Sequence, residues 1–176
     1  MIVLGVDPGL KHTGVGLVTS HGRQYELLHF EIHSPKPDLP LSAKLQSIHE
    51  FLTGIIREYH PDVLALEDVF YGTNVQSMVR IGEARACAML AGSQMGVRVV
   101  EYMPTRIKES VTGNGRASKE QIQSMVRNLL QLRGSLPPDG ADALAAAICH
   151  LNSQRHFESK EPVSKKRRWN VSPLNV

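Results

Sequence analysis

Apolar residues along the chain fall into short runs and into longer repeats with helical spacing. The short runs have the length and composition of β-strands. The first, MIVLGVD, is apolar almost throughout, as in a strand that is covered on both faces. His21-Gly22 is a turn signal between two of them. The five predicted strands are 1–7, 13–20, 23–33, 62–67 and 97–102.

Helical spacing appears between and after these strands. Residues 41–59 carry a continuous apolar face, and His60-Pro61 predicts the end of that helix. Pro104 suits the first turn of a short helix, and residues 118–121 form a capping box at the start of another. The predicted helices are 41–59, about 74–95, a short one from Pro104, one after Ser118 and one from near Asp139.

The order of these elements predicts an α/β protein. Three strands in a meander precede alternating helices and strands, which gives a five-stranded mixed β-sheet flanked by helices on both faces. The length of 176 residues suits one domain with a substantial core. We expect this domain to span 1–157, and a basic, flexible C-terminal tail without periodicity to follow at 158–176.

Charge is distributed unevenly along the chain. The net charge is +3, and residues 155–176 hold six of the 20 basic residues but two of the 17 acidic ones. Residues 76–133 hold nine basic and four acidic residues, a balance of +5. This basic middle segment favours contact with phosphates. Ordinary solvated helix faces are the simpler alternative.

Composition argues against several classes of protein. No run approaches ~20 consecutive apolar residues, so no membrane span is expected. The first residues lack the basic and apolar regions of a signal peptide. Cys87 and Cys149 lie in small-residue helical segments and are predicted to be buried free thiols. These features favour a cytoplasmic protein.

Asp7 and Glu67 each end a predicted strand that is otherwise apolar. Because Pro8-Gly9 follows Asp7, a turn-capping role is the simple alternative for that residue. A purely structural role explains Glu67 less well, since a buried carboxylate is costly unless it is paired, hydrogen-bonded or bound to metal. Ligand sites form beyond the carboxyl ends of parallel strands, so both residues are candidates for one site.

Asp139 and Asp142 are spaced i, i+3 at the start of the last predicted helix, which places them on one helical face. Either could be only a helix cap. Together with Asp7 and Glu67 they would complete an oxygen-rich pocket of the kind that Mg²⁺ prefers. Two ions ~3.5–4 Å apart could then stabilise the attacking and leaving oxygens of a phosphoryl displacement. The four carboxylates are therefore the predicted catalytic and metal-binding residues.

Several stretches of the sequence resemble the RuvC family of bacterial Holliday-junction resolvases, within the RNase H-like superfamily. They are LGVDPGLKHTGVGLV at 4–18, PDVLALEDVFYGTN at 61–74, IGEARACAMLA at 81–91, and TGNGRASKEQIQSMV with PPDGADALAAAICH within 112–150. Their common order and spacing make the resemblance specific, and it runs from residue 1 to about 150. The resemblance implies an RNase H-like fold and places the family's carboxylate tetrad on Asp7, Glu67, Asp139 and Asp142.

The resemblance also implies an activity. A RuvC-like protein would be a structure-selective endonuclease that resolves Holliday junctions in DNA recombination and repair. It would nick two strands of like polarity and leave 5′-phosphate and 3′-hydroxyl ends. Two Mg²⁺ ions in each active site are implied, with Mn²⁺ as a substitute. A homodimer acting on a four-way junction, and the RuvAB branch-migration complex as partner, are implied as well.

Further site residues follow from the resemblance. Phe70 is implied to stack on an unpaired base near the junction centre. Lys108 and Lys119 are implied to assist DNA binding and cleavage. Without the resemblance, Phe70 would more often be a core residue and the lysines ordinary surface residues. Weaker candidates for contacts with DNA phosphates are Arg80, Arg85, Arg106 and Arg116.

Three other hypotheses compete with this one. Another RNase H-like nuclease, acting on RNA–DNA hybrids or on different branched DNA, would carry the same acids. An actin-like ATPase or sugar kinase also has a phosphate loop after a strand-end Asp, as in VDPGLKHTG, but needs two related domains where this chain has room for one. The loss of an acid would favour a junction-binding protein without catalysis, and all four acids are present.

Overall fold

The computed structural model describes residues 1–68 and 75–158, which form strands and helices in a regular order. The strands are β1 (Val3–Asp7), β2 (Thr13–His21), β3 (Gln24–His33), β4 (Val63–Glu67) and β5 (Arg98–Tyr102). The helices are α1 (Leu41–Tyr59), α2 (Val75–Gln94), α3 (Pro104–Thr112), α4 (Lys119–Leu129) and α5 (Pro138–Glu158).

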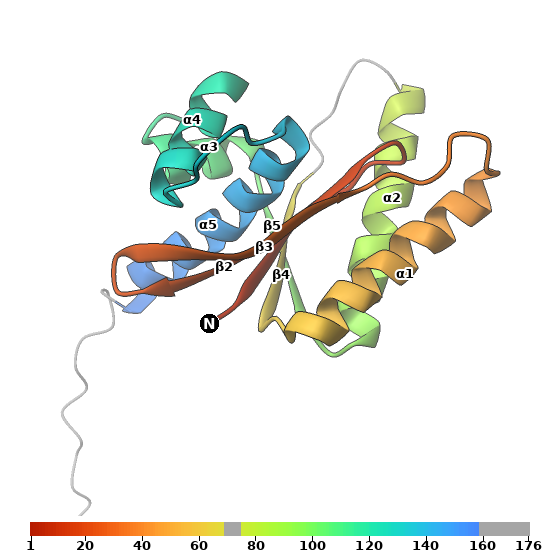
Figure 1. Ribbon diagram of the computed structural model, residues 1–176, viewed down its shortest axis with the longest axis horizontal. Helices are drawn as coiled ribbons and strands as arrows, with labels where there is room; N and C mark the ends of the chain where they lie inside the picture. The colour runs from red at the N-terminus through yellow and green to blue at the C-terminus, as the bar shows by residue number, and fades with distance from the viewer. Residues whose placement is uncertain (69–74, 159–176) are drawn as a thin grey trace, which may run out of the picture.

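The strands form one mixed sheet in the order β3-β2-β1-β4-β5 (Figure 1). β1 pairs antiparallel with β2 and parallel with β4, while β3 and β5 form the two edges. Because β1, β4 and β5 run parallel, their carboxyl ends lie at the same edge of the sheet. The central strand β1 is buried from Val3 to Val6.

Helices cover both faces of the sheet (Figure 1). α1 and α2 pack on one face against Leu4 and Val6, whereas α3, α4 and α5 pack on the other against Val3 and Ala65. Side chains alternate between the faces along each strand, so each strand contributes to both cores. The arrangement confirms the predicted α/β fold with a five-stranded mixed sheet.

Helix α5 lies against the sheet where the strands carry glycine. A Cβ atom at Gly5 would lie 1.9 Å from the carbonyl oxygen of Ala143, and one at Gly14 would lie 2.4 Å from that of Asp139. Any side chain at either position would collide with the helix backbone, so glycine permits the close approach. Because Gly14 is the cross-strand partner of Asp7, the start of α5 lies beside the end of β1.

The predicted elements are confirmed, with small shifts at their ends. The Ser118 hydroxyl accepts a hydrogen bond from the Gln121 amide, and the Gln121 side chain accepts one from the Ser118 amide, so the predicted capping box is present. The hairpin turn lies at Gly22 and Arg23, one residue later than predicted, because β2 continues through His21.

Cys87 and Cys149 are buried free thiols, as predicted. Across 1–68 and 75–158, no helix is long and apolar enough to cross a membrane. Phe70 lies outside the described residues, and so does the predicted tail at 158–176 apart from Glu158, the last residue of α5. The domain boundary and the role of Phe70 therefore stay predictions.

Candidate active site

Asp7 and Glu67 end two neighbouring parallel strands, in a register that places the ends of β1 and β4 side by side. Along a strand every second side chain has the same orientation, so Asp7 faces the same side as Gly5, and Glu67 the same side as Ala65. Gly5 and Ala65 both face α5. The two carboxylates therefore lie on the face of the sheet that α5 covers.

The first turn of α5 carries the other two predicted acids. The backbone of Asp139 lies against Gly14, which is the partner of Asp7 in the sheet. Asp142 follows three residues later and lies on the same side of the helix. Asp7 interacts electrostatically with Asp142 most strongly, then with Asp139 and then with Glu67. Two strands and one helix thus bring the four acids together.

The clustered negative charge changes the ionisation of the buried acids. Burial is the largest cause of a rise in the pKa of Asp7 from 3.8 to about 7, and the carboxylates of Asp142, Asp139 and Glu67 add to it. Burial and the neighbouring Asp142 also raise the pKa of Glu67. The site therefore holds more negative charge than the nearby lysines offset.

Lys119 and Lys108 supply positive charge at this site. Lys119 is the first residue of α4, and its Nζ lies 3.4 Å from Oδ2 of Asp142. Asp142 raises the pKa of Lys119, although burial of the ammonium opposes the rise. Lys119 lowers the pKa of both Asp7 and Glu67, and Lys108 lowers that of Glu67. The lysines thus favour the ionised carboxylates.

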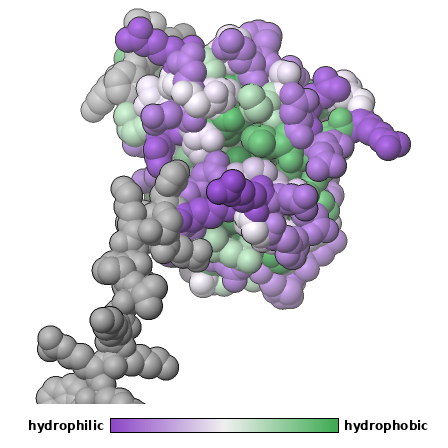
Figure 2. All heavy atoms as spheres, turned by 90° about the vertical axis from the view of Figure 1, so that its left-hand side faces the viewer, coloured by the Kyte–Doolittle hydropathy of each residue, from purple (hydrophilic) through white to green (hydrophobic). Residues whose placement is uncertain are grey.

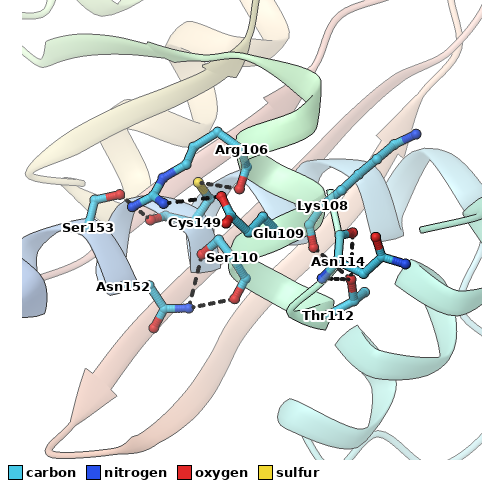
Figure 3. A network of polar contacts seen from close by, with 9 residues as sticks. All are labelled: Arg106, Lys108, Glu109, Ser110, Thr112, Asn114, Cys149, Asn152 and Ser153. Atoms are coloured by element: carbon cyan, nitrogen blue, oxygen red, sulfur yellow. Dashed lines mark hydrogen bonds and ion pairs between the residues drawn. The ribbon is translucent and has the colours of Figure 1, made fainter. Parts of the chain in front are cut away.

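Helix α3 is fixed to α5 by a polar network, shown in Figure 3. Asn152 donates hydrogen bonds at 3.1 Å to both the carbonyl and the hydroxyl oxygen of Ser110. Arg106 turns toward Glu109, with 3.5 Å between Nη1 and Oε2. The side chain of Lys108 extends away from this network (Figure 3). Lys108 is therefore held by a firmly attached helix while its ammonium stays outside the network.

Two small cavities open between these residues. One has a volume of about 290 Å³ and is lined by Asp7 and Glu67. The other has a volume of about 150 Å³ and is lined by Glu67, Asp142 and both lysines. Glu67 and Pro104 line both cavities, so the two adjoin. Asp7, Glu67, Asp142 and both lysines therefore line two adjoining cavities, whereas Asp139 lines neither of them.

The donor set fits a hard divalent cation. All four acids offer carboxylate oxygens, the ligand type that Mg²⁺ and Mn²⁺ prefer. The pKa of Asp7 is raised by burial first and by the neighbouring carboxylates second, and a bound cation would favour the ionised form against both. In the part of the chain that the structure describes, no three His, Cys, Asp or Glu side chains form a ready metal-binding group. Ion binding would therefore require the carboxylates to turn inward or a substrate phosphate to complete the ligand shell.

Most of the predicted arginines are paired within the protein. Arg80 contacts Glu83 at 3.1 Å, and Arg106 is paired as described above. Arg116 is exposed in the segment between α3 and α4. The contacts of these arginines with DNA phosphates stay predictions.

Arg85 contacts residues at the ends of β4 and β5. This structural role was not predicted from the sequence. Arg85 donates hydrogen bonds at 3.3 Å to the backbone carbonyl of Glu67 and to the Asp68 carboxylate, and it also contacts Glu101. Its side chain is only 15% exposed. Arg85 thereby ties α2 to the ends of β4 and β5. No spacing in the sequence indicates this role, because it depends on where α2 crosses the sheet.

A mixed five-stranded sheet in this strand order, with helices on both faces, is an RNase H-like fold. The family model for crossover junction endodeoxyribonuclease RuvC matches residues 3–150. The RuvC of Desulforamulus reducens is 43% identical over 158 residues, which are 89% of this chain and 97% of that protein. The chain belongs to the RuvC family.

Solved structures agree with this assignment. The RuvC structure from Thermus thermophilus has a TM-score of 0.82 at 32% identity and covers 89% of this chain and 97% of its own. T. thermophilus RuvC in complex with Holliday junction substrate gives a TM-score of 0.84 at 31% identity, with coverage of 89% and 96%. The yeast mitochondrial Holliday junction resolvase Ydc2, at 13% identity and a TM-score of 0.65, shares the fold.

Proposed function

We propose that the chain is a crossover junction endodeoxyribonuclease that resolves Holliday junctions in DNA recombination and repair. The observation that carries the proposal is the meeting of four carboxylates beside two lysines in a chain of the RuvC family. The relative solved with a Holliday junction substrate supports the same class of substrate.

In this proposal Asp7, Glu67, Asp139 and Asp142 hold two Mg²⁺ ions, which Mn²⁺ can replace. Bound ions supply a positively charged clamp for the attacking and leaving oxygens. Asp7 has to lose its proton before it can act as a ligand. Lys119 favours that loss, because its ammonium lowers the pKa of Asp7.

The lysines act on the DNA side of the same step. Water forms the new bond to phosphorus, the bond from phosphorus to the 3′ oxygen breaks, and a proton ends on that oxygen. The products carry 5′-phosphate and 3′-hydroxyl ends. Lys119, held beside Asp142, and Lys108, in the adjoining cavity wall, are placed to offset the negative charge that develops on the phosphate.

Paired nicking requires two active sites, and we propose that a second copy of the chain supplies the other one. An exposed stripe of apolar and small residues along α2 supports this. Val75, Val79 and Leu90 are 73%, 54% and 53% exposed, and Gly82 and Ala86 lie between them at helical spacing. Figure 2 shows the other side of the molecule, where hydrophilic residues surround a hydrophobic area, so the assignment rests on the exposure of the α2 residues. We therefore assign the homodimer contact to the α2 stripe.

The remaining parts of the proposal rest on the family. The nuclease domain spans 1–157, the basic tail at 158–176 follows it, and the protein acts in the cytoplasm with the RuvAB branch-migration complex. Phe70 stacks on an unpaired base near the junction centre.

Gel filtration with light scattering tests the proposed dimer. Val79→Asp in the α2 stripe should give monomers, and a variant that remains dimeric would contradict the assignment.

Cleavage of a substrate panel tests the proposed activity. The protein is incubated with a mobile four-way junction, a linear duplex and an RNA–DNA hybrid, with Mg²⁺ or with chelator. Paired nicks in the junction with Mg²⁺ alone are expected. Asp7→Asn should abolish cleavage and leave junction binding largely intact, whereas Asp38→Asn at an exposed site should change neither. Cutting of the hybrid instead would identify another RNase H-like nuclease. Loss of binding in a folded Asp7→Asn variant would contradict the separation.

A further inference from the structure

A larger hollow lies next to the carboxylate edge. It has a volume of about 670 Å³, and three segments far apart in sequence line it: the turn after β1, the segment that leads into α1, and the first turns of α2. These segments meet at the upper right of Figure 1. The side chains that matter for its chemistry are Leu10, Lys11, Leu41, Lys44, Arg80 and Ile81.

Positive charge dominates this lining. Lys11, Lys44 and Arg80 belong to it, and no Asp or Glu does among the described residues that line it. Lys44 donates one hydrogen bond, at 2.6 Å to the Pro37 carbonyl, and Arg80 donates one at 3.1 Å to Glu83. An ammonium has three N–H donors and a guanidinium five, so both cations keep donors for a ligand. Lys11 is exposed.

The hollow adjoins the site of the carboxylates. Ile81 lines both this hollow and the cavity at Asp7. Gly9, in the lining here, follows Pro8, which lines the carboxylate cavity. The phosphate backbone of a nucleic acid strand bound at the carboxylates can therefore continue directly into the hollow. Its cations and its apolar floor match the phosphates and the sugars of a nucleic acid strand respectively.

We propose that this basic hollow binds the phosphate backbone of the DNA strand that continues from the cleaved phosphate, with Lys11 and Lys44 as the contacts. The inference rests on the proposed function, because only a strand held at the carboxylates runs into the hollow. Both lysines lie outside the basic segment at 76–133. Contacts to phosphates fix the position of a strand without reading its bases. The hollow therefore adds affinity and register, and no sequence preference.

Salt dependence of junction binding tests the charge of the hollow. Affinity for a four-way junction is measured in chelator, so that no strand is cut, over a range of salt concentrations. The slope of log affinity against log salt falls by about 0.9 for each phosphate that the protein no longer neutralises, so Lys11→Gln with Lys44→Gln should lower it by about 2. Lys36→Gln removes an exposed lysine of the same segment that does not line the hollow, and should leave the slope unchanged. Lys11→Arg with Lys44→Arg should also keep it.

Neutral methylphosphonates locate the bound phosphates on the strand. Junctions carry one such group at successive positions on either side of the cleaved phosphate. The wild-type protein should lose affinity when the neutral group replaces a phosphate adjacent to the cleaved one. The double Gln variant should show no further loss of affinity at those positions, because it already lacks the two lysines. An unchanged salt slope in the double Gln variant, or the same methylphosphonate loss in both proteins, would overturn the inference. Failure of the proposed function looks different, because the wild-type protein would then leave the junction uncut with Mg²⁺.

Discussion

Replacement of Asp7 by Asn should stabilise the fold at neutral and alkaline pH when no divalent ion is present. Asp7 is buried among Glu67, Asp139 and Asp142, and its pKa rises from 3.8 to about 7. A group whose pKa is raised in the folded state contributes stability that is fully present below its unfolded pKa and is lost as the pH rises through its folded pKa. Asn does not ionise and therefore avoids the loss.

The size of the effect follows from the same shift. A rise in pKa from 3.8 to about 7 corresponds to roughly 4 kcal/mol of lost stability at pH 8, when Asp7 is ionised in both states. At pH 5 the folded protein still holds the proton on Asp7. The stability that the wild type has lost at this pH is therefore under about 2 kcal/mol. Mg²⁺ should reverse the order of stability of the two proteins. Saturating Mg²⁺ should stabilise the wild-type protein more than Asp7→Asn, because a ligand that binds only the folded state raises its stability.

Urea unfolding followed by circular dichroism measures these differences. The free energy of unfolding is compared for wild type and Asp7→Asn at pH 5 and pH 8, with chelator and with Mg²⁺. Asp38→Asn, at an exposed position outside the site, serves as the control and should change little. Equal or lower stability of Asp7→Asn at pH 8 in chelator would refute the idea of buried, repelling carboxylates. A gain that is as large at pH 5 would refute its electrostatic origin.

Three further outcomes are expected from the same structure. Gly14→Ala places a Cβ 2.4 Å from the Asp139 carbonyl, so it should cost about 1–3 kcal/mol of stability and slow cleavage more than binding, whereas Gly54→Ala in α1, with nothing within 4 Å, should be tolerated in both assays. Lys119→Met removes the cation that lowers the pKa of Asp7 and Glu67. The rising limb of the pH–rate profile in single-turnover cleavage should therefore move to higher pH, and an unchanged profile would contradict this role of Lys119. Phe70→Ala should impair cleavage more than junction binding, and wild-type cleavage rates would return Phe70 to a structural role.

Much of the fold can be predicted from the sequence because its signals are local. The capping box at 118–121, the break after Tyr59 and the proline at the start of α3 depend only on neighbouring residues. Asp7 and Glu67 also stand out locally, since each ends an apolar strand. Their convergence with the acids of α5 needs the strand order as well, and the family resemblance supplied that information.

Other parts of the site depend on packing that the sequence does not display. Gly5 and Gly14 permit the close approach of α5, and this role is evident only from the packing of α5 on the sheet. Arg85 resembles any exposed helical arginine until α2 is placed across the ends of β4 and β5. The basic hollow joins Lys11 and Lys44 to α2 across long sequence separations. A count of charge along the chain could not find it, because such a count compares sequence neighbours only.

The central claim is that the four carboxylates cut a four-way junction as paired, metal-dependent nicks. The most direct measurement labels the 5′ end of each strand of one mobile junction in turn and maps all cuts after incubation with Mg²⁺. We expect symmetric cuts in two strands of like polarity, complete resealing by DNA ligase, and no cuts with Asp7→Asn or chelator. Cuts in the linear duplex at the same rate, or junction products that ligase does not reseal, would contradict the claim.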